Sequence, residues 1–238
     1  SAWILTSPSN NSPPALPPTM PTFFPRLLLL ALLSPPLAAA KPVRDDTGQL
    51  VELAAPARRI VSLAPHATEL LFAVGAGSQL IAVTEFSDWP AEAKRLPSVG
   101  SYQALDLEKI LALRPDLVVG WASGNPQPQI ARLRAMGLPV FLSEPRQIGQ
   151  IAANLRSLSL LAGSAATGEA AARRFEAKIA ALKARHQGAR PVRVFYEIWP
   201  QPLMTLNGQH MVSQAITLCG GENVFAALGP LAPTVSVE

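Results

Sequence analysis

Short apolar runs alternate with helix-forming stretches from residue 57 to residue 147, and this alternation restricts the fold more than any other feature of the chain. The apolar runs are rich in Val, Ile and Leu, and they lie at 59–64, 80–84, 115–119 and 139–143. Helical patterns stand between them, at 66–74, 106–114 and 130–137. Strands that are separated by helices form a parallel sheet with helices on its faces. The sequence therefore predicts an α/β lobe over this part of the chain.

Two longer helical stretches follow this lobe. Residues 148–163 carry one apolar stripe, and residues 168–188 carry another on a helix that would run roughly 30 Å at about 1.5 Å per residue. A strand pattern over 193–199 and a helix over 211–221 then begin a second lobe, which is too short to build a layered core. We predict an α/β protein with two Rossmann-like lobes joined by a long rigid helix. The ligand cleft is expected between the lobes, and the second lobe is expected to be truncated at its C-terminus.

The predicted organisation has five parts. They are an upstream segment with a signal peptide at 1–40, an N-terminal hairpin at 41–56, the N-terminal α/β lobe at 57–147, a helical linker with the long backbone helix at 148–189, and the incomplete C-terminal α/β lobe at 190–238. The hairpin turn contains Asp45 and Asp46. Because turns favour aspartate, we expect both carboxylates to be solvated.

The first 40 residues are typical of a secretory leader. Met20, the expected start, precedes Arg26, the apolar run Leu27–Leu33 and the triplet Ala38–Ala40, which is the order of a signal peptide. The apolar run is shorter than the roughly 20 residues that a membrane-spanning helix needs. Cys219 is the only cysteine, so neither a disulfide nor a lipid-modified cysteine is expected. We predict an exported protein of the periplasm that is not lipid-anchored.

The sequence contains no recognisable catalytic or metal-binding constellation. The three histidines, His66, His186 and His210, lie far apart and lack a metal-binding spacing. No nucleophile elbow, dinucleotide fingerprint or phosphate-binding loop follows a strand. The formal net charge is +4, and the basic residues are scattered, so nucleic acid is not an expected partner. We expect a monomeric binding protein that has no catalytic residues and no bound metal.

Aromatic side chains gather where the predicted strands end. Phe86 follows the second strand, Tyr102 lies in the loop before the helix that Asp106 caps, and Trp121 follows the strand at 115–119. Trp199 ends the strand of the second lobe. Ligands of open α/β sheets bind outside the carboxyl ends of the strands, and aromatic rings offer large, rigid contact areas. Phe86, Tyr102, Trp121 and Trp199 are therefore the predicted ligand contacts.

Four neighbours of these aromatics have other expected roles. Trp89, next to Pro90, is expected to anchor its loop on the lobe. His66 is expected to cap the helix that it begins, with ligation of a metal in the ligand as the alternative. Gly120 and Gly124 are expected to let a ligand approach the backbone beside Trp121 closely.

Several ordered motifs resemble one family. They are IVSLAPHATELLFAVGAG, FSDWP, VGSYQALDLEKILALRPDLVV, WASGN and LCGGENVF, and together with WPQPLMTLNG they are similar to the periplasmic cobalamin-binding proteins of ABC importers. The resemblance covers about residues 42–238. It implies a protein that holds a corrinoid between two lobes with aromatic side chains and delivers it to an inner-membrane ABC permease and its ATPase. The family often has Tyr where this chain has Phe86, and Trp where it has Tyr102.

The resemblance also implies two docking residues. Members of the family contact the permease through one exposed acidic residue on each lobe, and Glu108 and Glu238 occupy the matching positions. Glu108 also lies in the first turn of a predicted helix, where the helix dipole favours an acid whatever its function.

The sequence is compatible with three alternatives. A haem- or ferric-siderophore-binding protein of the same fold would need an axial ligand, for which Tyr102 and His66 are candidates, or arginines in the cleft. An exported enzyme of corrinoid or metal metabolism would need catalytic groups beyond the present sequence. A surface adhesin is disfavoured because the chain has no repeats.

Overall fold

A four-stranded parallel sheet forms the core of the first half of the protein. The computed structural model describes residues 41–236, so the predicted leader with Met20 and the docking candidate Glu238 lie outside the described residues. The strand order is β4 (Leu80–Ala82), β3 (Ile60–Ser62), β7 (Leu117–Trp121) and β8 (Val140–Ser143). All three pairs of neighbouring strands in this order run parallel. The predicted α/β class with a parallel sheet is confirmed.

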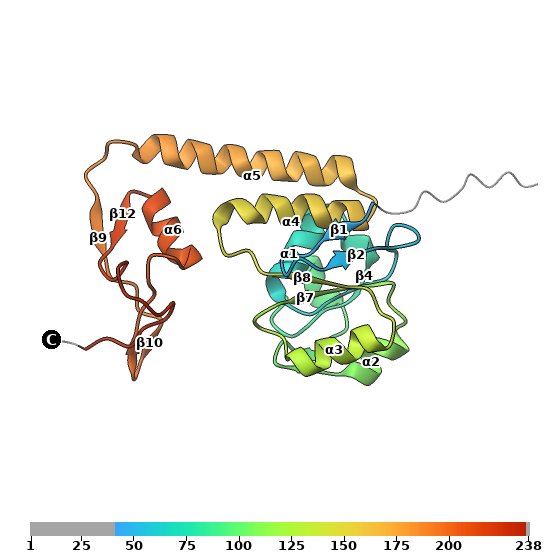
Figure 1. Ribbon diagram of the computed structural model, residues 1–238. Coiled ribbons are helices and arrows are strands. Elements are labelled where there is room, and N and C mark those ends of the chain that lie inside the picture. Colours follow the sequence, from blue (N-terminus) through green and yellow to red (C-terminus); the bar gives the residue numbers. More distant parts are fainter. Residues whose placement is uncertain (1–40, 237–238) are drawn as a thin grey trace, which may run out of the picture. The chain divides into compact units, whose positions relative to one another are not determined.

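Helices cover both faces of this sheet (Figure 1). Ile60, Leu117 and Phe141 point to the face that is covered by α1 (Pro65–Ala73) and α4 (Ile148–Leu161). Their strand neighbours point to the opposite face, which is covered by α2 (Leu107–Ala112) and α3 (Gln127–Ala135). Successive side chains of a strand alternate between faces, so a strand that is buried on both sides is apolar throughout. This is why the strand sequences form continuous apolar runs.

Short elements connect these layers. They are β1 (Val43–Arg44), β2 (Leu50–Val51), the 3₁₀ turns η1 (Gly77–Gln79) and η2 (Ala91–Arg95), and the strands β5 (Gly100–Ser101) and β6 (Ala104–Leu105). β1 and β2 pair antiparallel, as the hairpin pattern predicted, and so do β5 and β6. Asp106 caps α2 as predicted, because its Oδ1 accepts a hydrogen bond from the Lys109 amide at 2.9 Å.

The prediction that the hairpin turn is solvated was wrong for Asp45. This residue is 5% exposed, and its Oδ1 accepts hydrogen bonds from the amides of Thr47 and Gln49, both at 2.9 Å. Its Oδ2 accepts from the Leu142 amide at 3.2 Å and pairs with Arg134 at 3.2 Å. The turn packs against the end of β8, so the carboxylate of Asp45 also accepts a hydrogen bond from the backbone of this edge strand.

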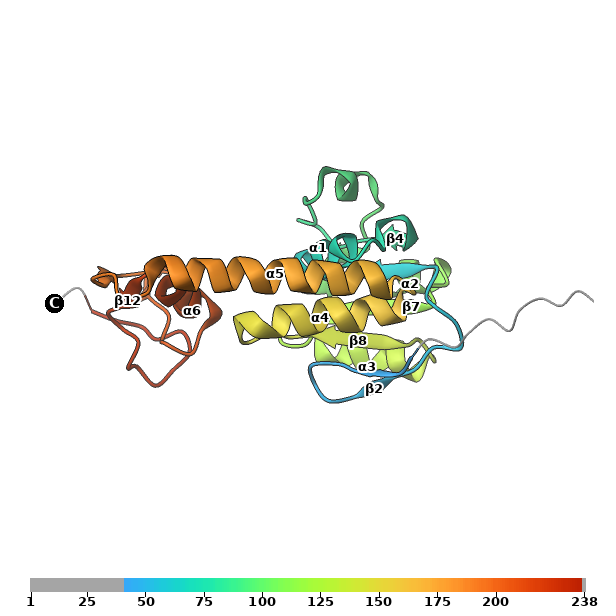
Figure 2. The same ribbon diagram turned by 90° about the horizontal axis from the view of Figure 1, so that it is seen from above.

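A pair of long helices follows the sheet. α4 and α5 (Ala165–His186) lie side by side in both Figure 1 and Figure 2. α5 has 22 residues, which corresponds to roughly 33 Å at about 1.5 Å per residue. It begins three residues before the predicted start at 168, since Ala165, Ala166 and Thr167 continue the helix on its N-terminal side. The prediction of one long helix at this position is confirmed.

The region from 190 to 236 contains smaller elements. β9 (Val192–Val194) pairs in parallel with β12 (Gly221–Asn223), β10 (Trp199–Pro200) pairs antiparallel with β11 (Leu203–Met204), and α6 (Met211–Leu218) lies between them in sequence. The strand predicted over 193–199 was wrong beyond Val194. The chain leaves β12 there because the amide of Ile198 donates to the Met204 carbonyl at 3.0 Å, which starts a separate hairpin. Within residues 41–236, no helix is both long enough and apolar enough to cross a membrane.

Candidate functional site

One buried asparagine joins the loops at the carboxyl ends of two central strands. Asn125 is 3% exposed, and its Oδ1 accepts a hydrogen bond from the Trp121 amide at 2.7 Å. Its Nδ2 donates to the Leu63 carbonyl, just after β3, at 2.9 Å and to the Tyr102 carbonyl at 2.8 Å. A single side chain therefore fixes the backbone at two of the predicted ligand contacts. The sequence analysis missed this role, although an asparagine four residues after a strand-end tryptophan is a turn residue that often bonds nearby backbone.

The ring of Trp121 lies beside two other aromatic rings. The centroid of the His66 ring is 5.7 Å away in an edge-to-face arrangement, and the Tyr102 ring is also 5.7 Å away, tilted by 42°. These separations are typical of favourable aromatic pairs. The predicted contacts Trp121 and Tyr102 are thus neighbours in space.

The glycines around Trp121 have a different role from the one expected. A Cβ atom on Gly124 would lie 1.9 Å from the Trp121 ring, and one on Gly120 would lie 3.0 Å from both Asn125 and Leu142. Both positions are filled by the protein itself. The expectation that these glycines open the backbone to a ligand was wrong, since they allow the Trp121 loop to fold onto itself.

Glu144 holds the same loop from the end of β8. Its two carboxylate oxygens accept from the Ser123 amide at 2.8 Å and from the Ser123 hydroxyl at 3.0 Å. The Glu144 amide in turn donates to Asp46 at 2.6 Å, and Asp46 also accepts from the side chain of Asn154. The N-terminal hairpin, β8 and the Trp121 loop therefore form one hydrogen-bonded unit.

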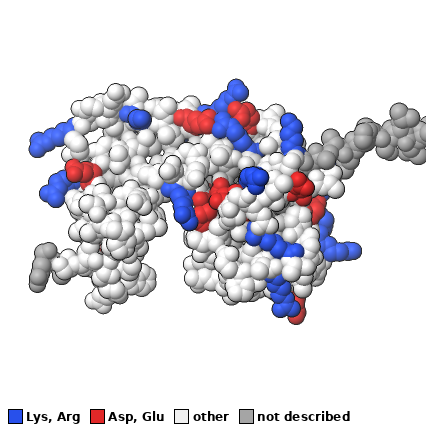
Figure 3. Space-filling model, in the orientation of Figure 1, with Lys and Arg blue, Asp and Glu red and all other residues white. Residues whose placement is uncertain are grey.

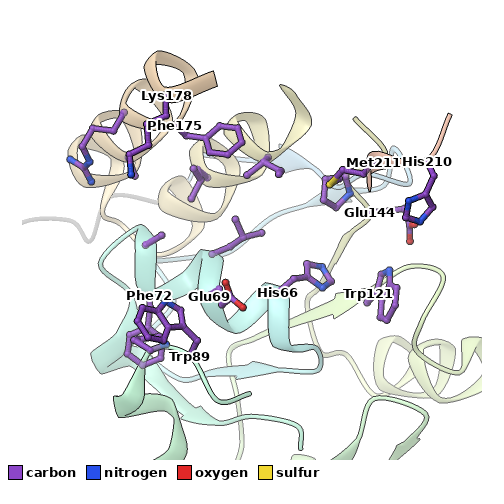
Figure 4. Close-up of a pocket in the computed structure, with 18 residues that line it drawn as sticks. His66, Glu69, Phe72, Trp89, Trp121, Glu144, Phe175, Lys178, His210 and Met211 are labelled. Atoms are coloured by element: carbon purple, nitrogen blue, oxygen red, sulfur yellow. The ribbon is translucent and has the colours of Figure 1, made fainter. Parts of the chain in front are cut away.

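A cavity of about 900 Å³ opens beside this unit (Figure 4). Its wall comes from α1, α4 and α5, from the loops after β4 and β8, from Trp121 at the end of β7, and from His210 and Met211 at the start of α6. Apolar side chains make up much of it, among them Leu70, Phe72, Ile151, Leu155 and Phe175. Cavities of this size and character bind bulky, partly apolar small molecules.

Two histidines line the cavity. Burial lowers the pKa of His66, against the opposing effects of the nearby carboxylates of Glu144 and Asp46. The Nε2 atom of His66 lies 3.2 Å from the Ser143 hydroxyl. The expectation that His66 caps the helix was wrong, because Ala64 is the N-cap residue of α1 and no side chain caps that end. His210 does cap a helix: its Nδ1 accepts from the Val212 amide at 3.1 Å, and burial lowers its pKa.

The predicted contacts Phe86 and Trp199 are not among the residues that line the cavity. Phe86 is 70% exposed and has a φ of 64°, a left-handed conformation that is uncommon for a residue with a side chain. Trp199 is 59% exposed in β10, and its indole nitrogen donates to the Gln201 carbonyl at 3.0 Å. Glu108 is exposed in the first turn of α2.

Two further features differ from the expectations or extend them. Trp89 lines the cavity and is 69% exposed, so the expectation that it anchors its loop on the lobe was wrong. Arg174 and Lys178 of α5 also line the cavity, and the sequence analysis did not place them there. The signal that could have found them is their spacing of four residues, which puts them on one face of the long helix.

No group of three or more His, Cys, Asp or Glu side chains in the described part of the chain could hold a metal ion. The geometry is therefore that of a binding cavity with an aromatic wall and a polar, hydrogen-bonded rim.

Comparison with known proteins identifies the family. Residues 60–238 match the family described as "Periplasmic binding protein". The chain belongs to this family. Its members are binding proteins, and the prediction of a protein that is not an enzyme is confirmed on that basis.

Similar sequences include proteins named for one vitamin. The chain is 43% identical over 183 residues to the vitamin B12-binding protein of Vibrio parahaemolyticus and 41% identical over 182 residues to that of Yersinia pestis. The matched stretches cover 77% and 76% of this chain. They span 66% and 65% of the lengths of these relatives.

Solved structures of similar fold include vitamin B12-binding and haem-binding proteins. The periplasmic vitamin B12-binding protein of Vibrio cholerae has a TM-score of 0.70 and 40% identity, with 76% of this chain and 71% of that chain covered. The periplasmic haem-binding protein RhuT of Roseiflexus sp. RS-1 has a TM-score of 0.67 and 29% identity, with 75% and 70% covered. A periplasmic haem-binding protein of Pseudomonas aeruginosa has a TM-score of 0.67 and 28% identity, with 76% and 67% covered.

Proposed function

We propose that the protein is a periplasmic substrate-binding protein that captures cobalamin or a related corrinoid. It delivers this ligand to an inner-membrane ABC permease and its ATPase, and it acts as a monomer. The observation that carries the proposal is the Trp121 ring, which contacts the rings of His66 and Tyr102 at the wall of a cavity of about 900 Å³. A corrin is broad, flat and partly apolar, and it requires a cavity of this kind.

The likeness to vitamin B12-binding proteins supports this choice of ligand. Identity to them reaches 43%, whereas the haem-binding structures named above have 29% and 28%. The position of Trp121 supports contact with the ligand directly, and that of Tyr102 supports it through Trp121. We include Phe86 and Trp199 in the proposed contact set because both are exposed aromatic rings.

The proposal includes the wider organisation of the protein. A signal peptide at 1–40 exports the chain without a lipid anchor, a hairpin at 41–56 precedes the first lobe at 57–147, and the linker at 148–189 leads to a second lobe at 190–238. The 22-residue α5 supports a stiff connection between the lobes, with the ligand cleft between them. Glu108 and Glu238 are the proposed docking residues for the permease, and the exposure of Glu108 is compatible with that role.

A second candidate ligand is haem. The observation that favours it is His66, an imidazole at the cavity wall whose lowered pKa keeps it neutral, as a metal ligand must be. Two solved structures of similar fold are haem-binding proteins. Haem and a corrinoid use His66 differently. A corrinoid needs only contact with the imidazole ring, whereas haem needs a ring nitrogen of His66 coordinated to its iron.

Parallel titrations distinguish the two ligands. The 238-residue chain is titrated with cyanocobalamin and with haemin while tryptophan fluorescence and visible absorption are recorded. The proposal expects saturable quenching by cyanocobalamin and elution of the corrinoid with the protein in gel filtration. If haemin alone binds, and its Soret shift disappears in His66→Ala, haem is the ligand and the corrinoid proposal is refuted.

A further inference from the structure

The long helix α5 has two chemically different sides. On one side, Glu169 and Glu176 pair with Arg156 of α4 at 2.7 Å each. Arg173 also pairs with Glu169 at 2.8 Å. Both glutamates on that side are therefore ion-paired, and their pairs with Arg156 join the two helices.

The other side of α5 carries basic groups that have no such partners. Arg174 and Lys178 are four residues apart, so they share one face of the helix, and both line the cavity. Neither forms an ion pair with any side chain in the part of the chain that the structure describes. Phe175, between them, lines the same cavity.

Aromatic side chains face these two bases across the cavity. Figure 4 shows Phe72 and Trp89 below α5 at one end of the cavity, while Trp121 and His210 lie at the other end. Glu69 of α1 lies between the two ends. It is exposed and forms no ion pair with Arg174 or Lys178 in residues 41–236. The other carboxylate that lines the cavity, Glu144, lies beside His210 and Met211 at the Trp121 end and accepts hydrogen bonds from Ser123. The Arg174–Lys178 end therefore has two positive charges against the one negative charge of Glu69.

We infer that the Arg174–Lys178 end of the cavity is a subsite for a phosphate group attached to an aromatic base. Arginine binds phosphate oxygens through its planar fork of donors, and lysine adds a mobile point charge. Phe72, Trp89 and Phe175 offer apolar surface for a ring. The Trp121 end, by contrast, offers aromatic surface and neutral imidazole.

This inference rests on the proposed function and extends it. Cobalamin carries a nucleotide tail in which a negatively charged phosphodiester is joined to a benzimidazole. Cobinamide has the same corrin ring without phosphate and base. The subsite therefore distinguishes a complete corrinoid from one that lacks its nucleotide, while the Trp121 end binds the ring that both share.

The test compares these two ligands on matched variants of the full chain. In the first variant, Arg174→Gln and Lys178→Gln remove the two bases of the cavity. In the control, Lys183→Gln and Arg185→Gln remove two bases of the same helix that do not line this cavity, so the change in net charge is equal. Cyanocobalamin and dicyanocobinamide are titrated into each protein at low ionic strength, where exposed charges act most strongly.

The unmodified chain and the control are expected to prefer cyanocobalamin by about three- to tenfold, the effect of one or two exposed ion pairs. The cavity variant is expected to lose this preference while its affinity for dicyanocobinamide stays unchanged. Inorganic phosphate is expected to weaken cyanocobalamin binding to the unmodified chain and not to the cavity variant.

Each other outcome has a distinct meaning. If the unmodified chain binds both corrinoids equally, or if the cavity variant keeps the preference, the subsite is refuted and corrinoid binding stands. If the cavity variant loses affinity for both ligands by the same factor, the two bases act on the whole cavity and the subsite is likewise refuted. If neither corrinoid binds the unmodified chain, the proposed function fails and the subsite falls with it.

Discussion

Aromatic residues lie in different surroundings in the region before α4 and in the region after α5. In the first region, β3, β7 and β8 are buried, and Trp121 extends from the end of a buried strand. In the region from 190 to 236, Val192 is 66% exposed and Trp199 is 59% exposed. On the face that Figure 3 displays, the surface of this second region is mostly uncharged. Trp121 therefore extends from a buried strand, whereas Trp199 belongs to an exposed one.

Both regions nevertheless use the same local device. Asn125 binds three backbone groups in the first region. Asn207 is 2% exposed in the second region, and its Nδ2 donates to the carbonyls of Leu228 at 3.0 Å and Gly229 at 3.2 Å. Substituting Asn125 and Asn207 one at a time therefore separates the effect of losing a buried asparagine from the effect of its place in the molecule.

The largest effect is expected from Asn125→Ala. The substitution leaves the Trp121 amide and the carbonyls of Leu63 and Tyr102 without their partner, which costs about 3 kcal/mol of unfolding free energy. It also frees Trp121, so cyanocobalamin affinity is expected to fall more than tenfold. Urea unfolding and a fluorescence titration measure the two effects.

Asn207→Ala is the matched control for this substitution. It is expected to reduce the unfolding free energy while cyanocobalamin affinity changes much less, because its partners Leu228 and Gly229 do not line the cavity. Equal losses of affinity in the two variants would remove the distinction between the regions.

The next effect concerns the tryptophans themselves. Trp121→Ala removes a ring that two neighbours hold at the cavity wall, and we expect a loss of about 2 kcal/mol in binding, roughly 30-fold in affinity. Trp199→Ala removes a ring that is exposed and held by one hydrogen bond to Gln201, so a smaller loss is expected. Calorimetric titration with cyanocobalamin measures both, and the opposite order would show that the second region dominates binding.

A smaller effect is expected from pH through His66. Its folded pKa lies below the ordinary value of 6.5 because burial disfavours the charged ring, although Glu144 and Asp46 oppose this. As the pH falls below 6.5, the unfolded chain takes up the proton first, so stability decreases until the folded pKa is passed. His66→Gln is expected to reduce this loss, measured as urea midpoints at about pH 7.5 and about pH 5.5.

His210→Gln provides the comparison from the start of α6. The pKa of His210 is also lowered by burial, and its Nδ1 must stay unprotonated to accept from the Val212 amide. His210 is an N-cap residue at the surface of its region, so its substitution is expected to change the pH dependence less than His66→Gln. A flat pH dependence in the unmodified chain would contradict the assignment for both histidines.

The smallest effect is expected from the ion pairs that join α4 to α5. Hydrogen bonds from Arg156 and Arg173 lower the pKa of Glu169 to about 2, so the contribution of this pair is present above 4.5 and is lost as the pH falls toward 2. Arg156→Gln is expected to lower the urea midpoint slightly at low salt, and the difference is expected to vanish in high salt because these groups are solvent-accessible. Arg132→Gln, at an exposed position of α3 without an ion pair in residues 41–236, is the control.

The sequence by itself determined the parallel sheet, the cap at Asp106, the long helix and the place of Trp121 at a strand end. Each of these depends on residues close together in the chain: a run of β-branched residues, an aspartate before a helix, or an apolar stripe of helical period. The motifs around WASGN, which indicated a binding protein, are likewise short stretches of neighbouring residues.

Only the tertiary structure decided which distant groups meet. The burial of Asp45 depends on the backbone of Leu142, the role of Asn125 depends on Leu63 and Tyr102, and the presence of Arg174 and Lys178 at the cavity depends on how α5 lies against α1 and α4. The partners in these contacts are tens of residues apart, and no periodic pattern connects them. Hydrogen bonds and charges of this kind are specified by packing, which a pattern along the chain does not record.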